Sequence, residues 1–280
     1  MKLIAIILTF NEEIHLERCL INIRNYFNDI YVVDSFSNDK TKEISLKYKV
    51  RFLENKFINH ANQFNWALTQ IDDDVDWIFR IDADEILTKN LKKELFNKLP
   101  KLDESIKGVS INRYIAFQGK LLKFGGVFPN KITRIFRKGF GFYENKWMDE
   151  RLTVNGKVIS FKSNIIDHNL KPLNWWIKKH NIYANKEALE LFKKNYPLFS
   201  NKSHNYVKDT KGNLLNFKDL YSLFPLIIRS FLFFLYRYFI RLGFLDGYQG
   251  ICFHFLQGFW YRFLVDAKYI ELTKKIKENS

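Results

Sequence analysis

Glycine is missing from residues 1–107 of this 280-residue chain, and Gly108 is the first one. The N-terminal part therefore has neither a glycine-rich phosphate loop nor a G-x-G-x-x-G turn, which counts against both a P-loop enzyme and a dinucleotide-binding dehydrogenase. Cysteine is scarce as well. Cys19 and Cys252 are the two cysteines; they lie far apart and both have apolar neighbours. They offer neither a disulfide framework nor zinc-ligand spacing, which suits a reducing cytosol.

A secretory signal peptide is not indicated either. The apolar run Leu3–Leu8 is short, Glu12 and Glu13 follow it closely, and no small-residue cleavage site appears. We interpret this run as a first buried strand.

Positive charge and aromatic residues are what the chain has in excess. The formal net charge is +15, and Phe, Trp and Tyr make up 17% of the residues. A charge of this sign indicates an anionic partner, which is a nucleic acid, a nucleotide or an acidic membrane. No RNA- or DNA-binding signature accompanies the basic residues, so we expect no nucleic-acid partner.

Strand-like and helix-like segments alternate in the N-terminal part. Apolar runs of strand length at 3–8, 29–34, 50–53 and 77–81 are separated by segments with helical periodicity. This alternation predicts βαβ units with right-handed crossovers and a parallel sheet. The predicted fold class is therefore α/β.

Three carboxylates follow the last of these strands. Asp82, Asp84 and Glu85 stand where the strand at 77–81 ends. Ligands of open α/β sheets bind at the carboxyl ends of the strands. Mg²⁺ and Mn²⁺ favour oxygen ligands, and Mg²⁺ is commonly held by one or two carboxylates together with substrate phosphates. The segment is thus a candidate metal and phosphate site; the alternative is a solvated acidic turn.

Four motifs occur in an order that resembles a known family. They are Leu8-Thr9-Phe10-Asn11-Glu12, Val33-Asp34-Ser35 with Asn38-Asp39-Lys40-Thr41, Gln63-Phe64-Asn65-Trp66-Ala67-Leu68 and Ile81-Asp82-Ala83-Asp84-Glu85. They resemble the nucleotide-sugar-binding half of the family 2 inverting glycosyltransferases. More narrowly they resemble bacterial lipopolysaccharide-core beta-1,4-glucosyltransferases and related capsule enzymes. The resemblance implies a GT-A fold, with a Rossmann-like, mostly parallel sheet flanked by helices. Phe36 stands where many relatives carry glycine, and Arg80 lies in a strand that is usually apolar.

The resemblance also implies roles for the donor side. Thr9 and Asp34 would hydrogen-bond a uracil or ribose, Asp82 would contact the ribose side, and Asp84 would bind the Mg²⁺ or Mn²⁺ that bridges the diphosphate. The expected nucleotide-sugar-binding residues are Thr9, Asn11, Glu12, Asp34, Asp82 and Arg134. Asp34 has an alternative role as a helix or turn cap, and Thr9 as a turn hydroxyl. We expect Gln63 and Asn65 to be supporting residues.

The middle of the chain resembles the acceptor side of the family. Arg134 and Arg137 are able to face phosphates, although surface ion pairs are an equal alternative. Inverting transfer needs a carboxylate that accepts the proton of the acceptor hydroxyl. Glu150 is the expected base, with Asp149 in reserve; the alternative is a surface turn at these positions. His168 is expected to complete the metal shell or to touch the diphosphate, and a structural role is its alternative.

The last part of the chain is aromatic and basic. The apolar stretch 223–241 is interrupted by Arg229 and Arg237, and a central arginine costs about 2.5–3.5 kcal/mol on insertion scales. At 100° per residue these two and Arg241 fall within a sector of roughly 120°. We therefore predict an amphipathic helix in the membrane interface, with the arginines toward anionic headgroups. The alternative is a core helix. The run Gly243–Gly247 is again characteristic of the lipopolysaccharide-core subgroup, and a second aromatic helix is predicted at 251–265.

These observations combine into one hypothesis. Residues 1–195 form a GT-A catalytic domain (1–107 for the nucleotide-sugar donor, 108–195 for the acceptor), 196–216 a linker, and 217–280 a helical membrane-associating segment. The enzyme would move a hexose, glucose from UDP-glucose, onto a membrane-held glycolipid such as a lipopolysaccharide core. It would be cytoplasmic and peripherally attached to the anionic inner leaflet of the inner membrane. The rival hypotheses are a nucleotidyltransferase and a non-catalytic basic binding protein.

Overall fold

The computed structural model describes residues 1–144, 152–196 and 224–278. The chain divides into two compact units, each with its own contacts. Unit 1 comprises Met1–Lys123 and Val127–Leu170, and unit 2 comprises Phe124–Gly126 and Lys171–Ser280. The helix at 173–195, which the sequence analysis grouped with the catalytic domain, lies in unit 2.

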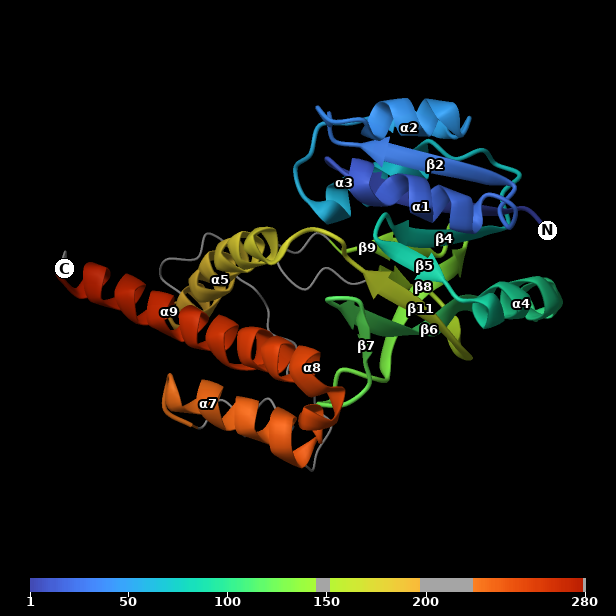
Figure 1. The fold of residues 1–280 in the computed structure, drawn as a ribbon. Helices are drawn as coiled ribbons and strands as arrows, with labels where there is room; N and C mark the ends of the chain where they lie inside the picture. The colour runs from blue at the N-terminus through green and yellow to red at the C-terminus, as the bar shows by residue number, and fades with distance from the viewer. Residues whose placement is uncertain (145–151, 197–223, 279–280) are drawn as a thin grey trace. The chain divides into compact units, whose positions relative to one another are not determined.

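A nine-stranded mixed sheet forms the centre of unit 1 (Figure 1). Its order is β3-β2-β1-β4-β8-β6-β11-β5, with β7 paired to β6. The strands are β1 (Leu3–Thr9), β2 (Asp29–Asp34), β3 (Arg51–Glu54), β4 (Trp77–Asp82), β5 (Glu85–Leu87), β6 (Ile106–Phe117), β7 (Lys120–Leu122), β8 (Asn130–Arg137) and β11 (Lys157–His168). β9 (Gly141–Tyr143) and β10 (Leu152–Val154) form a separate pair. The first four strands are mutually parallel, as predicted.

Helices cover both faces of this sheet. They are α1 (Glu13–Ile23), α2 (Thr41–Lys47), α3 (His60–Thr69), α4 (Lys89–Lys98) and the short η1 (Leu99–Lys101). Successive β1 side chains point to opposite faces. Leu3, Ala5 and Ile7 pack with α1 and α4, whereas Ile4 and Ile6 pack with α3. β1 therefore reads as a continuous apolar run because both of its faces are buried.

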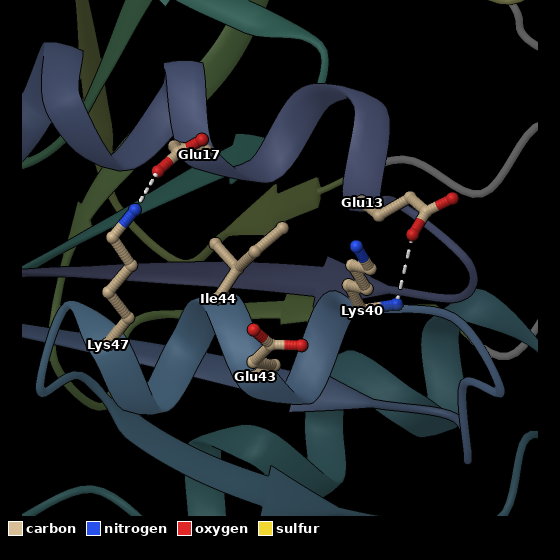
Figure 2. A pocket seen from close by; sticks show the side chains of 6 residues that line it. All are labelled: Glu13, Glu17, Lys40, Glu43, Ile44 and Lys47. Atoms are coloured by element: carbon tan, nitrogen blue, oxygen red, sulfur yellow. Dashed lines mark hydrogen bonds and ion pairs between the residues drawn. The ribbon is translucent and has the colours of Figure 1, made fainter.

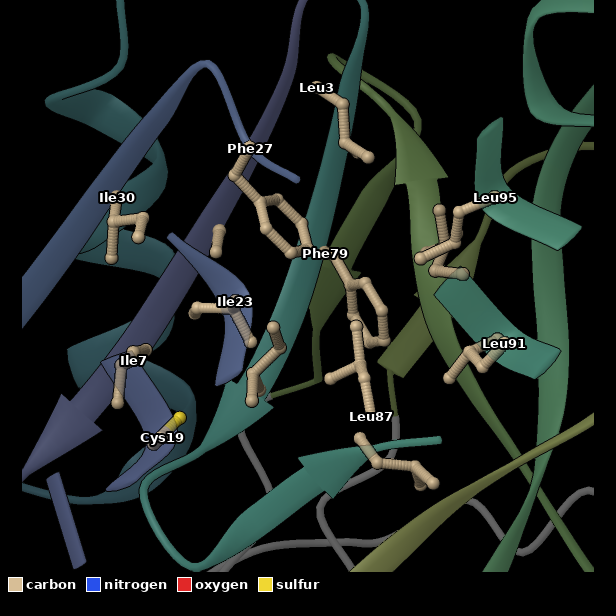
Figure 3. Packing of buried hydrophobic residues seen from close by; sticks show 14 of the residues in the cluster. Leu3, Ile7, Cys19, Ile23, Phe27, Ile30, Phe79, Leu87, Leu91 and Leu95 are labelled. Carbon is tan, nitrogen blue, oxygen red and sulfur yellow. The ribbon is translucent and has the colours of Figure 1, made fainter. Parts of the chain in front are cut away.

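The larger of the two cores is built around aromatic rings. Phe27 and Phe79 lie with ring centroids 5.8 Å apart, and Cys19 and Ile23 of α1 pack beside them (Figure 3). Each fully buried side chain of this size contributes about 1.5–3 kcal/mol. This packing fixes the strand ends that carry the polar motifs. The α/β fold with a mostly parallel N-terminal half is confirmed.

Unit 2 is helical. It contains α5 (Leu173–Asn195), α7 (Ile228–Leu235), η3 (Tyr236–Ile240), η4 (Gly243–Asp246), α8 (Gly247–Phe253), η5 (His254–Trp260) and α9 (Tyr261–Glu278). α5 packs on α9 through Ala184, Ala188, Tyr261 and Val265. Within the ranges that the structure describes, no helix combines the length and the apolar character needed to cross a membrane.

The predicted orientation of the arginines toward headgroups is wrong for Arg229 and Arg237. Arg229 forms an ion pair with the buried carboxylate of Asp266, with Nε 2.9 Å from Oδ2. Arg237 is buried and donates to the carbonyl of Gly125 (3.0 Å) and to the side chain of Gln257. Both therefore face the interior of unit 2, because the helices supply acceptors there that helical periodicity alone does not reveal.

The structure supplies a reason for the glycines around 243–250. A Cβ on Gly243 would lie 2.5 Å from the ring of His254, and one on Gly250 would lie 2.4 Å from the carbonyl oxygen of Gly243. Gly247 has φ of +65°, which favours glycine. The turn thus brings backbone against backbone and against the His254 ring, and side chains do not fit there.

Candidate functional site

Polar residues that the sequence singled out meet at the carboxyl ends of neighbouring strands. Thr9 of β1 is the register partner of Asp34 of β2, and Leu8 is the partner of Asp82 of β4. The expectation that these strand ends lie side by side is therefore met. The three strand ends together form the edge at which open α/β sheets bind ligands.

Asp34 organises the loops at this edge. Its carboxylate is buried and accepts from Thr9 Oγ1 (2.7 Å), Ser37 Oγ (2.6 Å) and Ser37 N (2.6 Å). Asn11 N donates to Ser37 Oγ (2.7 Å), and Asn38 N donates to Asn11 Oδ1 (3.0 Å). Asp34 thus acts as a turn cap in this arrangement. Thr9 and Asn11 join the two loops that follow β1 and β2.

Two exposed phenylalanines flank these loops, and sequence reasoning assigned them no function. Phe10 and Phe36 each leave 58% of their surface exposed. Phe36 adopts φ of +60°, a backbone conformation that favours glycine. Aromatic rings at a polar edge are able to stack on a nucleobase. The sequence feature that pointed to this site is Phe36 itself, a phenylalanine where the family resemblance leads one to expect glycine.

Glu12 is engaged by a buried histidine. His15 Nδ1 lies 2.6 Å from Glu12 Oε2, and the backbone N–H of Leu170 donates to His15 Nε2 (2.8 Å). Because Nε2 accepts, the ring proton is on Nδ1 and is donated to Glu12. The pair fixes the start of α1 to the segment after β11. In this structure Glu12 supports the site through its carboxylate.

Asp82 is held between two arginines. Arg134 Nη2 lies 2.8 Å from Asp82 Oδ2, and Arg80 Nη2 lies 3.0 Å from Oδ1. Burial would raise the pKa of Asp82, but the two guanidinium groups outweigh it and hold that pKa well below its ordinary value. Asp82 is therefore ionised throughout the physiological pH range.

Arg134 is buried and bridges two carboxylates. It donates to Glu85 Oε1 (2.7 Å) as well as to Asp82, and the backbone N–H of Asp82 donates to Glu85 Oε2 (2.9 Å). Burial raises the pKa of Glu85 to about 7, against the attraction of Arg134. The guanidinium expected to face phosphates is thus directed at these carboxylates. Arg137 donates to backbone carbonyls of Ile106 and Leu102 (3.0 and 3.2 Å).

A chain of contacts extends this support to α3. Asn65 and the backbone of Tyr143 exchange two hydrogen bonds of 2.8 and 2.9 Å. The Tyr143 hydroxyl accepts from Arg80, which pairs with Asp82. Gln63 donates to Ser35 Oγ (3.2 Å). Asn65 and Gln63 therefore support the site through hydrogen bonds to Tyr143 and Ser35, in keeping with the supporting role predicted for them.

Asp84 and His168 come together because β5 pairs with β11. His168 N donates to the Asp84 carbonyl (3.0 Å), and Asn169 Nδ2 donates to Asp84 Oδ2 (2.9 Å). Arg18 Nη1 lies 3.2 Å from His168 Nδ1. A guanidinium only donates, so Nδ1 accepts, and Nε2 carries the proton when the ring is neutral. Burial, Arg18 and His15 lower the pKa of His168, which favours that neutral form.

The donor set partly fits a divalent cation. The described residues contain no group of three or more His, Cys, Asp or Glu side chains arranged to hold a metal. Asp84 suits the single-carboxylate mode in which substrate phosphates complete the shell. Burial, and to a smaller extent the charge of Asp84, raise the pKa of Asp167 to about 6. Metal-binding histidines usually donate their second ring N–H to an acceptor, whereas His168 Nδ1 faces a donor.

The expected base lies outside the described residues. Glu150 and Asp149 belong to the segment 145–151. Their assignment stays a prediction.

A separate hollow of about 460 Å³ lies between α1 and α2 (Figure 2). Two contacts join residues that line it. Lys47 contacts Glu17 (2.7 Å), and the Lys40 backbone donates to Glu13 (3.1 Å). None of the site residues considered above lines it.

Known proteins are similar to this chain over more than half of its length. The model of Glycosyl transferase family 2 matches residues 4–154. An uncharacterized glycosyltransferase of Rickettsia conorii (strain ATCC VR-613 / Malish 7) is 25% identical over 100% of this chain and 91% of its own length. The lipopolysaccharide core biosynthesis glycosyltransferase LpsC of Rhizobium meliloti (strain 1021) is 29% identical over 67% of this chain and 71% of its own.

Glucosyl-3-phosphoglycerate synthase from Mycobacterium tuberculosis, in complex with Mn²⁺, UDP and phosphoglyceric acid, is similar at a TM-score of 0.42 and 12% identity, over 62% of this chain and 73% of that one. The family model spans more than half of the chain, including every motif at the strand ends. The chain belongs to glycosyl transferase family 2 and is an enzyme that transfers a sugar from a nucleotide-sugar donor.

Proposed function

We propose that this glycosyltransferase moves a hexose, glucose from UDP-glucose, onto a lipopolysaccharide-core or other lipid-linked glycan with inversion at the anomeric carbon. The observation that carries the proposal is the meeting of Asp34, Asp82 and Asp84 around one sheet edge. The base and ribose lie against the loops after β1 and β2, where Phe10 and Phe36 offer exposed rings. Asp82, kept ionised by its arginines, accepts from ribose hydroxyls.

The diphosphate lies toward Asp84 and His168. Asp84 would hold Mg²⁺ or Mn²⁺, and such an ion would supply positive charge to the leaving diphosphate. His168 donates Nε2–H to a phosphate oxygen, a role that the Arg18 contact favours over metal ligation. Arg18 adds positive charge beside it. Of the two roles expected for His168, we favour contact with the diphosphate.

The transfer itself is a single displacement. The acceptor hydroxyl oxygen forms a bond to the anomeric carbon, the bond from that carbon to the phosphate oxygen breaks, and the electron pair leaves with the diphosphate. Glu150 takes the hydroxyl proton, with Asp149 as the alternative base. Because inversion uses one displacement, no covalent sugar–enzyme intermediate forms.

The acceptor assignment draws on a relative. LpsC is named for lipopolysaccharide core biosynthesis, and its match covers 67% of this chain. A lipid-linked acceptor requires that the enzyme work at a membrane. We therefore propose a cytoplasmic enzyme that attaches peripherally to the inner membrane.

A turnover assay tests this proposal. Purified protein is incubated with UDP-glucose, UDP-galactose and their N-acetyl forms, with Mn²⁺ or with EDTA. We expect transfer from UDP-glucose that EDTA abolishes. Asp84→Ala should lose donor binding, whereas Glu150→Gln should keep it and lose about 10²–10⁴ in kcat. Asp73→Ala is the matched control, since this exposed carboxylate pairs with Lys138 away from the sheet edge. Transfer that persists in EDTA would refute the role of Asp84.

A further inference from the structure

Unit 2 exposes an unusual number of large apolar side chains. They lie on residues 224–263, which we call the apolar face, and include Phe231, Phe239, Ile240, Leu245, Tyr248 and Phe255. Ile240 and Tyr248 leave 71% and 70% of their surfaces exposed. Single exposed apolar residues are ordinary on proteins, but a concentration within one short stretch marks an interaction surface.

Arg229 and Arg237 of the same stretch point inward, and Asp266 lies buried beside Arg229. Asp266 is 1% exposed and accepts from Arg229 Nε (2.9 Å), from Ser230 Oγ (3.3 Å) and from the backbone N–H of Ile227 (2.9 Å). Arg237 is 8% exposed and donates to the Gly125 carbonyl and to Gln257. The interior of this stretch therefore contains charged and polar pairs, while its outside carries phenylalanine, leucine and isoleucine.

This distribution is the reverse of the one that water selects. Arginine and aspartate belong at a water-facing surface, where hydration stabilises their charge. In hydrocarbon the preference is inverted, because ionisable groups face the protein interior and pair there, and apolar side chains face the solvent. The stretch is thus built for contact with an apolar phase.

Several features favour lipid as that phase. Arg241 is exposed between the exposed Ile240 and Leu242, which suits a side chain that reaches from the acyl boundary to a headgroup phosphate. The exposed Tyr248 suits the same interfacial depth. The net charge of +15 complements anionic headgroups. α7 and η3 together comprise residues 228–240, which corresponds to about 20 Å at 1.5 Å per residue. The hydrocarbon core is about 30 Å thick, so this length suits an orientation in the plane of the membrane.

We propose that the apolar face inserts into the acyl boundary of an anionic bilayer, with α7 and η3 lying in the plane of the membrane. The buried pairs of Arg229 and Arg237 remove charge from the inserted surface, and the exposed Arg241 contacts phosphate. Apolar burial holds the protein on the membrane, and electrostatic attraction brings it there. This role does not depend on the identity of the donor or acceptor.

Vesicle flotation of the full chain tests the proposal. The vesicles contain phosphatidylcholine alone or phosphatidylcholine with phosphatidylglycerol, at 0.1 M and 1 M NaCl. We expect binding to anionic vesicles that retains at least half of its extent at 1 M NaCl, because apolar burial is not screened. Complete release at 1 M NaCl would overturn insertion in favour of surface attraction alone.

Matched variants locate the contact. Ile240→Asp/Leu245→Asp changes two exposed residues of the apolar face, and Leu46→Asp/Ile58→Asp changes two comparably exposed residues of unit 1. We expect the first variant to partition at least tenfold more weakly and the second to bind like the parent chain. An equal loss of vesicle binding in both variants would overturn the proposal. It would also be overturned if the parent chain were a dimer, the first variant a monomer, and neither bound vesicles, because the apolar face would then be a contact between two copies of the chain. Melting curves and UDP binding, measured on both variants, distinguish misfolding or a failed donor site from loss of the membrane contact.

Discussion

At the scale of single residues, charge pairing decides what the candidate donor site can do. Asp82 cannot act as an acid, since Arg80 and Arg134 keep it ionised. Arg134 is 4% exposed and directs Nη2 at both Asp82 and Glu85. It is a positioning residue in this arrangement, and its substitution would expose buried charge.

The first prediction concerns Arg134. Arg134→Met should destabilise the protein by about 3–5 kcal/mol, because Glu85 and Asp82 would lose their shared partner inside the protein. Arg134→Met/Glu85→Gln should be less destabilised than Arg134→Met alone, since one of the two unpaired charges is gone. Urea unfolding of the single and double variants measures this coupling. Simple additivity of the two single effects would contradict a shared ion pair.

The second prediction concerns Phe36, whose substitution should raise the stability of the protein. Its φ of +60° is unfavourable for a residue with a Cβ by about 1–2 kcal/mol, and glycine relieves that strain while loosening the unfolded chain. Phe36→Gly should therefore raise stability by up to about 1 kcal/mol yet weaken UDP binding several-fold. Lys49→Gly is the control, because Lys49 also has positive φ (+53°) but follows α2. Calorimetric titration with UDP would contradict stacking if both variants bound equally.

At the scale of elements, the turn between η3 and α8 is built around a buried histidine. The His254 ring fills the space beside Gly243 and Gly125, and neither ring nitrogen has a hydrogen-bond partner among the residues that the structure describes. Burial lowers the pKa of His254 to about 4, and Arg237 adds to the effect. The neutral ring is thus part of the packing of unit 2.

A pH dependence follows from this packing. The unfolded chain binds a proton at His254 below about pH 6.5, whereas the folded chain binds it only near pH 4. Stability is therefore fully present above pH 6.5 and falls as the pH drops toward 4, by at most about 1.4 kcal/mol per unit for one proton. Urea unfolding between pH 4 and 7 measures the slope. His254→Gln should flatten it, and an unchanged slope would assign the effect to other groups.

At the scale of the whole molecule, local pattern and distant pairing differ in what they reveal. The run Leu3–Leu8 and the motif around Asp82 predict strands and the sheet edge, since periodicity and strand-terminal carboxylates are local signals. The partners of Arg229 and Arg134 lie 37 and 49 or more residues away, so no periodicity reveals them. The observed contacts thus show that Arg229 faces the interior of unit 2 and not a headgroup, and that Arg134 contacts carboxylates and not a phosphate.

The contrast between local sequence signals and distant contacts also explains why the sequence left alternative roles for Asp34 and His168. Asp34 was expected either to bind the donor or to cap a turn, because a carboxylate after a strand suits both. Asp34 caps a turn in this structure because the hydroxyls of Ser37 and Thr9 donate to its carboxylate. Thr9 and Asp34 come together only when β1 and β2 pair. His168 is similar: the ring alone allows metal or phosphate contact, and the distant Arg18 selects the tautomer. Residue identity therefore names the candidates, and the packing around them distinguishes the roles.

The division into two units leads to the last prediction. Every residue proposed for the donor site that the structure describes, from Thr9 to His168, belongs to unit 1, whereas the apolar face belongs to unit 2. UDP with Mn²⁺ at 100 times its dissociation constant stabilises the state that binds it by about 2.7 kcal/mol. Hydrogen exchange should therefore slow at amides of β1, β2 and β4 and remain unchanged in α7 and α9. Asp84→Ala should remove the protection, because the phosphates would lose the cation that Asp84 is proposed to hold. Equal slowing in both units would show that nucleotide binding also orders the helical unit, and would contradict a donor site confined to the sheet.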